Sequence, residues 1–152
     1  MKIEIPSISD YDRVNELAVQ VHEFHVKLRP DLFLKSDVVI TEERFKELVL
    51  KNEIYVAKDN DRVVGYIIFN IVEKTNPLMR YRKQLNIENI CVDELDRNKG
   101  VGTKILLFVK EFAILNNCTD LYLTVNEENK NAIKLYEKLG FKVKEIEYLM
   151  SL

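Results

Sequence analysis

One stretch near the middle of the chain constrains the fold most, because an apolar run, a pair of glycines and a helical pattern follow one another without a break. The run QLNIENICV, residues 84–92, is typical of a strand. It leads into DELDRNKGVG, where Gly100 and Gly102 are two of only four glycines in 152 residues. Apolar side chains then recur at helical spacing from Val101 to Phe112. A strand, a glycine-rich turn and a helix in this order can bind phosphate, because the first N–H groups of a helix lack internal partners and lie at the positive end of its dipole.

Two common nucleotide-binding motifs do not fit this spacing. A P-loop requires the order G-x-x-x-x-G-K-[ST], whereas Lys104 stands four residues after Gly100. A dinucleotide fingerprint requires a third glycine where Ile105 stands, and an early place in the chain. The pattern that remains is R-x-x-G-x-G from Arg97, which by itself is also compatible with a tight strand-to-helix turn whose charges are solvated.

A second motif, NKNAIKLYEKLGF, begins at Asn129. Its residues Asn129, Ala132 and Tyr136 have the spacing that places them on one face of a helix. Residues 87–143 strongly resemble the GNAT superfamily of acetyl-CoA-dependent N-acetyltransferases. The matching residues are Arg97, Gly100 and Gly102 in the first motif, and Asn129, Ala132, Leu135, Tyr136, Gly140 and Phe141 in the second.

The resemblance implies an α/β fold (α+β, with a mixed sheet) of the GNAT type. This is an acyl-CoA N-acyltransferase sandwich with the order β-α-α-β-β-β-α-β-α-β, here in one domain over residues 1–152. The periodicity of the chain predicts the same elements. We expect Ser9 with Asp12 to cap the first helix and Thr41 to cap the second. The closing run FKVKEIEYLMSL predicts one or two strands.

The resemblance also implies a function, the transfer of an acetyl group from acetyl-CoA directly to a primary amine of a small molecule or a protein. The backbone amides of residues 98–103 would close around the pyrophosphate of coenzyme A. The strand before them would bulge and leave backbone groups free for the pantetheine arm. The expected residues of this site are Ile90, Cys91, Val92, Arg97, Asn98, Lys99, Gly100, Val101, Gly102, Thr103, Asn126 and Asn129.

Tyr136 resembles the general acid of the family, which would protonate the departing thiolate. The alternative is a core tyrosine that packs beside Leu135 and Leu139. Glu88, on the strand before the glycines, is a candidate for the group that removes a proton from the amine, or else a solvated strand residue. The only histidines, His22 and His25, lie on the first helix, where packing is the simpler role. Cys91 has no partnered base, so a spatial role is expected rather than a covalent one.

Composition limits the partners. A net charge of −2 argues against a protein that binds nucleic acid through bulk charge. No stretch approaches the roughly 20 apolar residues of a membrane span, and the N-terminus lacks an apolar signal core. Two cysteines without metal-ligand spacing suit a reduced, cytoplasmic protein with no metal. The basic cluster of the chain, expected in the loop 74–83, consists of Arg80, Arg82 and Lys83.

Two questions stay open at this level. A non-catalytic acyl-CoA-binding or regulatory module on the same fold is the alternative to an enzyme. The apolar run from Tyr148 to Met150 is compatible with a homodimer formed through late strands, or with a simple core strand.

Overall fold

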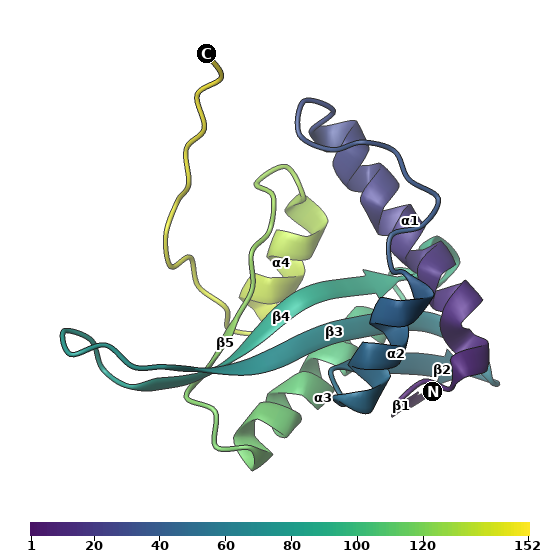
Figure 1. The fold of residues 1–152 in the computed structure, drawn as a ribbon, viewed down its shortest axis with the longest axis horizontal. Coiled ribbons are helices and arrows are strands. Elements are labelled where there is room, and N and C mark those ends of the chain that lie inside the picture. The colour runs from purple at the N-terminus through teal and green to yellow at the C-terminus, as the bar shows by residue number, and fades with distance from the viewer.

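In a computed structural model that describes all 152 residues, the chain forms one five-stranded sheet with helices on both faces (Figure 1). In chain order the elements are β1 (Lys2–Glu4), α1 (Tyr11–Leu28), α2 (Glu42–Leu50), β2 (Ile54–Asp59), β3 (Arg62–Lys74), β4 (Arg82–Val92), α3 (Val101–Leu115), β5 (Asp120–Tyr122) and α4 (Lys130–Lys138). Short 3-10 turns, Ile8–Asp10 and Glu94–Asp96, come before α1 and α3. The predicted α/β order is confirmed as far as α4. No helix is both long and apolar enough to cross a membrane.

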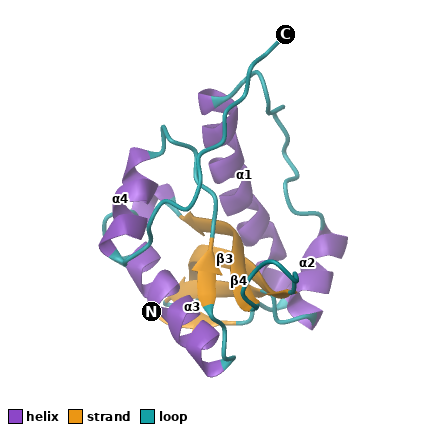
Figure 2. Cartoon of the chain, turned by 90° about the vertical axis from the view of Figure 1, so that its left-hand side faces the viewer, coloured by secondary structure: helices purple, strands orange, loops and turns teal.

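The strands lie in the order β1-β2-β3-β4-β5, and neighbours are antiparallel except for β4 and β5, which are parallel. Helices α1 and α2 pack on one face of the sheet, and α3 and α4 pack on the other (Figures 1 and 2). Each face has its own core, one that includes Phe45 and Tyr66 and one that includes Phe69 and Ile105. Both faces of the middle strand β3 are covered by helices and do not meet water, which explains why its side chains are apolar on both faces.

The first helix begins differently from the prediction, whereas the second begins as predicted. The carboxylate of Asp10 accepts hydrogen bonds from the backbone N–H and the hydroxyl of Ser7, at 2.8 and 2.9 Å. The cap therefore lies two residues earlier than Ser9 and Asp12, and it encloses a 3-10 turn before α1. Thr41 caps α2, since its hydroxyl accepts the N–H of Arg44 at 3.2 Å.

Strand β4 contains the feature that positions the site. Its pairing with β3 shifts register between Ile68 and Phe69, so Glu88 has no partner on β3 and forms a bulge. Its pairing with β5 is limited to residues 84–86. Beyond Asn86, the edge of β4 that faces β5 has no neighbouring strand, which matches the predicted splaying of the two strands.

The basic cluster lies only partly in a loop, which corrects the prediction. Strand β4 begins at Arg82, so Arg82 and Lys83 are strand residues and only Arg80 is outside the sheet. Arg82 pairs with Asp120 on β5, and Lys83 stands opposite Glu73 on β3. These cations therefore connect strands by cross-strand charge pairing.

The predicted closing strands are absent. Helix α4 ends at Lys138 and is closed by Gly140, whose φ of 94° lets its N–H and that of Phe141 donate back to the carbonyls of Glu137 and Tyr136, both at 3.0 Å. The following eleven residues, 142–152, here called the tail, lead away from the sheet (Figure 1). Every tail residue is exposed, and no hydrogen bond joins the tail to the rest of the chain. A strand requires a neighbour for its backbone groups, and the tail has none.

Candidate acetyl-CoA site

The loop between β4 and α3 presents an unbroken run of free backbone donors. None of the N–H groups of residues 98–103 donates a hydrogen bond within the chain. The first helical hydrogen bond of α3 is donated by the N–H of Lys104 to the carbonyl of Gly100, at 3.1 Å. Asn98 and Gly100 have positive φ, 63° and 81°, a conformation that asparagine tolerates and glycine adopts freely. The free donors therefore gather at the positive end of α3, where an anion is stabilised.

The two glycines of the motif serve different purposes. A Cβ at Gly100 would meet no atom within 4 Å, so the requirement there is the backbone angle. A Cβ at Gly102 would lie 3.2 Å from Leu135 Cδ2 on α4 and 3.7 Å from Val92 Cγ2 on β4. Gly102 therefore allows α3, α4 and β4 to approach one another closely beneath the loop.

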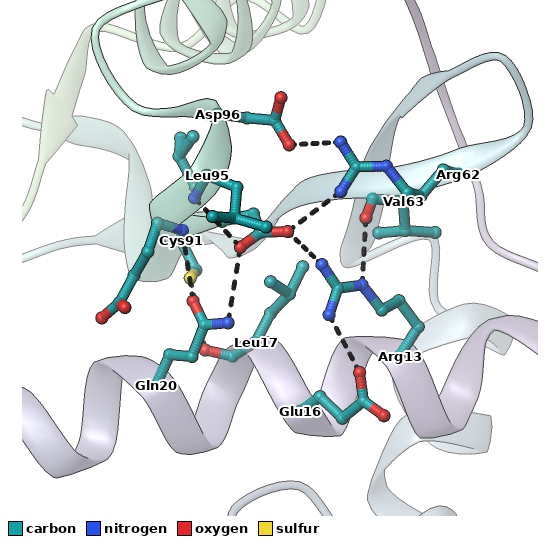
Figure 3. A network of polar contacts seen from close by, with 12 residues as sticks. Arg13, Glu16, Leu17, Gln20, Arg62, Val63, Cys91, Leu95 and Asp96 are labelled. Carbon is teal, nitrogen blue, oxygen red and sulfur yellow. Dashed lines mark hydrogen bonds and ion pairs between the residues drawn. The ribbon is translucent and has the colours of Figure 1, made fainter.

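A network of ion pairs holds the start of the loop in place (Figure 3). At its centre is Asp93, buried at the end of β4, which pairs with Arg13 from α1 and with Arg62 Nη1 at 3.0 Å from β3. Its carboxylate also accepts the side-chain amide of Gln20 at 3.4 Å and the N–H of Leu95 at 3.3 Å. Burial alone would raise the pKa of Asp93, but these hydrogen bonds and the Arg13 charge outweigh it, so the pKa is lowered.

Asp96 extends this network into the loop. Its carboxylate binds Arg62 Nη2 at 2.5 Å and Lys99 Nζ at 2.9 Å, and these hydrogen bonds lower its pKa. Lys99 is therefore turned toward a carboxylate of the protein. Arg97 is held more loosely, with Nε 3.4 Å from the carbonyl of Val92 and Nη2 3.7 Å from Glu94. Of the two predicted cations, Arg97 is the freer to meet a phosphate.

The strand residues predicted for the pantetheine arm divide between the two faces of the sheet. Ile90 and Val92 pack against the α3–α4 core, whereas Cys91 is buried in the α1–α2 core. The thiol of Cys91 donates to the carbonyl of Leu17 at 3.2 Å. Burial raises the pKa of this thiol to about 12, so it is a packing residue and a poor nucleophile.

Tyr136 is half-buried on α4, and its ring packs on Phe141 with centroids 5.7 Å apart. Its hydroxyl has no hydrogen-bond partner among the contacts of the chain, and burial raises its pKa. Asn129 caps α4, since its Oδ1 accepts the N–H of Ala132 at 3.3 Å. Asn126 forms a turn before it, with Oδ1 accepting the N–H of Glu128 at 2.9 Å. Both asparagines retain free amide donors.

The candidates for the group that removes a proton from the amine lie on the face of the sheet that α1 and α2 cover. Glu88 is exposed at the bulge of β4, with Oε2 3.5 Å from Arg44 of α2. Beside it, the hydroxyl of buried Tyr66 donates to Asn89 at 2.8 Å. His22 contacts the carbonyl of Leu34 at 2.6 Å, and His25, whose pKa is lowered by burial, packs beside Phe33. The histidines thus hold the segment after α1 in place. No group of three or more acidic, histidine or cysteine side chains is arranged so that it could hold a metal ion.

Four residues of the ion-pair network were not predicted: Arg13, Arg62, Asp93 and Asp96. Members that pair with each other lie up to 80 positions apart in sequence, and no spacing rule connects them. The signal that could have been noticed is local, since two aspartates flank a short turn directly before the glycine motif.

Comparison with known proteins agrees with this geometry. Residues 18–141 match the model of the Acetyltransferase (GNAT) family. The chain is 32% identical over 104 residues to an uncharacterised N-acetyltransferase of Methanocaldococcus jannaschii, a match that covers 67% of this chain and 45% of that protein. It is 25% identical over 142 residues to the spermine/spermidine N(1)-acetyltransferase of Bacillus subtilis, covering 93% of this chain and 88% of that protein.

Solved structures give the same result. A crystal structure of a mutant protein of Bacillus halodurans, 28% identical, superposes with a TM-score of 0.95 over 100% of this chain and 99% of its own. An aminoglycoside N-acetyltransferase in complex with CoA, 14% identical, shares the fold with a TM-score of 0.72 over 99% of this chain and 98% of its own. The predicted enzyme class, N-acetyltransferase, is thereby confirmed, and the chain belongs to the GNAT family of acetyltransferases.

Proposed function

We propose that this protein transfers the acetyl group of acetyl-CoA to a primary amine. The observation that carries the proposal is the run of six free N–H groups, residues 98–103, next to the unpaired edge of β4. A pyrophosphate fits the first feature, because it offers several anionic oxygens to successive backbone donors. An extended amide-containing arm fits the second, because it can pair with a strand edge as a further strand would.

In this arrangement the pyrophosphate lies at the start of α3, with Arg97 available for its charge. The pantetheine arm runs between β4 and β5, along Ile90, Cys91 and Val92. A backbone N–H of this stretch donates to the thioester carbonyl oxygen, on which negative charge develops. The free amide groups of Asn126 and Asn129 donate to the arm from the other side.

The chemical step forms a C–N bond and breaks a C–S bond. The neutral amine attacks the carbonyl carbon of the thioester, and the sulfur leaves as a thiolate with the electron pair of the C–S bond. Tyr136 gives its hydroxyl proton to that thiolate. The nitrogen is positively charged once the C–N bond has formed, and the proton that it then loses returns to the Tyr136 oxygen, directly or through water. The raised pKa of Tyr136 favours the protonated phenol, which is the form that can act as an acid.

The amine must lose a proton before it attacks, because an alkylammonium titrates near pH 10.4 and has no free electron pair. We assign this step to Glu88, acting directly or through water, because it is exposed at the bulge where β4 leaves β5. The Bacillus subtilis relative is named for spermine and spermidine, so aliphatic polyamines are the first acceptors to test.

A non-catalytic acyl-CoA-binding module remains the alternative. The experiment begins with thermal unfolding of the purified protein with acetyl-CoA, CoA, NADH and ATP in parallel. A ligand at 100 times its Kd adds about 2.7 kcal/mol of stability. We expect stabilisation by both CoA species, and its loss in Gly100→Trp. An amine screen that detects free thiol follows, with Tyr136→Phe as the comparison. A chain that binds acetyl-CoA but releases no thiol with any amine is a binding module.

The proposal also concerns the setting of the enzyme. We propose a cytoplasmic protein whose partners are acetyl-CoA, the amine and a second copy of the chain, with no nucleic acid or membrane. Two free cysteines, Cys91 and Cys118, support a reducing compartment.

A further inference from the structure

The turn that leads into the free backbone donors is strongly acidic for the entrance to an anion site. Three carboxylates, those of Asp93, Glu94 and Asp96, come directly before the free N–H groups of residues 98–103. A cluster of carboxylates beside an anion site repels the anion unless cations offset it. Asp93 and Asp96 are buried, so partners within the protein must offset their charges.

One side chain reaches the carboxylates at both ends of this turn. Arg62 has Nη1 3.0 Å from Asp93 Oδ2 and Nη2 2.5 Å from Asp96 Oδ2 (Figure 3). Asp93 caps the 3-10 turn Glu94–Asp96, and Asp96 is its last residue. The planar guanidinium therefore spans the turn with its two terminal nitrogens, which a single ammonium group cannot do.

The contact continues from Asp96 into the loop. The other oxygen of Asp96 accepts Lys99 Nζ at 2.9 Å, and the N–H of Lys99 is one of the free donors. Arg62 itself is held by the sheet, because β3 begins at Arg62 and this residue stands opposite Asp59 of β2. A residue of the β2–β3 hairpin thus holds a loop that lies between β4 and α3.

The other members of the network hold only the beginning of the turn. Arg13 and Gln20, both on α1, bind the carboxylate of Asp93 and make no hydrogen bond with Asp96. Arg62 is therefore the link between the sheet and the end of the turn that enters the loop. Its side chain is 48% exposed, so its removal leaves no cavity in either core.

We infer that Arg62 is a positioning residue for acetyl-CoA: it holds the turn 93–96 closed, so that the donors of residues 98–103 are in place before the pyrophosphate arrives. The inference rests on the proposed function, because it takes this loop as the cofactor site. A ligand that binds only the ordered loop has an apparent Kd equal to its intrinsic Kd divided by the ordered fraction. Ordering the loop in advance removes that loss of affinity.

Calorimetric titration of the full chain with acetyl-CoA tests the inference. We expect Arg62→Ala to bind about tenfold more weakly than the wild type, with the loop ordered in about a tenth of the molecules. Arg62→Lys should bind almost as weakly, because one ammonium group cannot hold both carboxylates.

Lys58→Ala is the matched control. Lys58, on β2, also bridges two carboxylates, with Nζ 3.4 Å from Glu4 and 2.8 Å from Asp10, and it makes no contact with the turn 93–96. Its loss should lower the Tm and leave the Kd for acetyl-CoA unchanged. A residue that only stabilises the fold behaves in this way, so the two variants separate positioning from stability.

Backbone dynamics separate positioning from a direct effect of charge on the phosphates. In Arg62→Ala the NMR order parameter of the Gly100 N–H should fall below about 0.6, the range of flexible backbone, while those of Gly65 and Gly140 stay unchanged. Initial rates with an amine from the screen should show a KM for acetyl-CoA raised by the same factor and an unchanged kcat, because the bound cofactor orders the loop in both proteins.

Three results would overturn the inference: an unchanged Kd in Arg62→Ala, full recovery of binding in Arg62→Lys, or weaker binding with an equally ordered Gly100. The last two would assign Arg62 to the charge of the site alone. A wild-type chain that does not bind acetyl-CoA refutes the proposed function itself. A wild-type chain that binds acetyl-CoA no more tightly than Arg62→Ala does refutes only the role of Arg62.

Discussion

Gly102 and Leu135 meet where the two motifs of the chain join, and a Cβ on Gly102 would lie 3.2 Å from Leu135 Cδ2. Gly102, the second residue of α3, is thus packed against the helix that carries Tyr136. The loop proposed for the cofactor and the helix of the candidate acid therefore share this packing contact.

This contact predicts coupling between the two positions. Gly102→Val should reduce the free energy of unfolding by about 1–3 kcal/mol, because α4 must move to accept the added methyl groups. In Gly102→Val/Leu135→Ala the loss should be smaller than the sum of the single losses, because the truncated side chain makes room. Chemical denaturation of the four proteins measures this cycle. Additive losses would show that Gly102 is required only for its backbone.

We expect Gly65→Ala to reduce the free energy of unfolding more than Gly102→Val does, although alanine is the smaller side chain. A Cβ there would lie 2.7 Å from the carbonyl oxygen of Cys91, a backbone atom that cannot turn aside. Gly65→Ala should therefore cost about 2–3 kcal/mol of stability and shift β4 away from β3. Gly140→Ala is the comparison, because it has free space but a φ of 94°, and should cost about 1 kcal/mol. Equal losses would contradict the clash as the cause.

Asp93 predicts an acid-sensitive fold. Its pKa is lowered in the folded protein, so its contribution to stability is present above the unfolded value near 3.9 and is lost as pH falls through the lower, folded value. Asp93→Asn should destabilise the protein by about 2 kcal/mol at pH 7, because Arg13 and Arg62 lose their buried partner. Melts from pH 7 to pH 3 should show a shallower loss for this variant than for the wild type. Glu94→Gln, at an exposed neighbouring position, should follow the wild type throughout.

Asn129 allows a capping role to be separated from a binding role. Asn129→Asp retains the oxygen that accepts the Ala132 N–H but removes the amide donor. We expect wild-type stability and at least about tenfold weaker acetyl-CoA binding, equivalent to about 1.4 kcal/mol for a lost hydrogen bond. Asn129→Ala should show the weaker binding and also lose about 1 kcal/mol of stability, because the cap is removed. Calorimetric titration checks both, and unchanged affinity in the aspartate variant would limit Asn129 to capping.

Tyr136 predicts a specific pH profile. Burial raises its pKa, so the phenol stays protonated throughout the neutral range and no loss of acid function is expected below about pH 10. Tyr136→Phe should lower kcat by about 100-fold or more with little change in acetyl-CoA affinity. Initial rates between pH 6 and pH 10, combined with titration calorimetry, test this. A phenylalanine variant with near wild-type kcat would show that Tyr136 is a core packing residue and not the general acid.

The local features of the fold could be predicted because short-range rules decide them. Spacing located Thr41 as a cap, Gly140 as the glycine just past the end of α4, and Gly100 at the start of α3, since each depends on the backbone of a few adjacent residues. The first cap was misplaced by two residues because Ser7 with Asp10 and Ser9 with Asp12 share one spacing, and the carboxylate of Asp10 also binds Lys58 on β2.

By itself, the sequence determined the family, the order of elements as far as α4, and the position of the glycine turn before α3, because periodicity and glycine spacing act within one strand and one helix. Tertiary structure alone decided that Asp93 gathers Arg13 and Arg62, and that Cys91 is turned into the α1–α2 core. It also decided that the tail has no strand beside it. These outcomes depend on which distant segments are brought together in the two cores. The spacing of residues along the chain does not specify how far apart such segments lie in space.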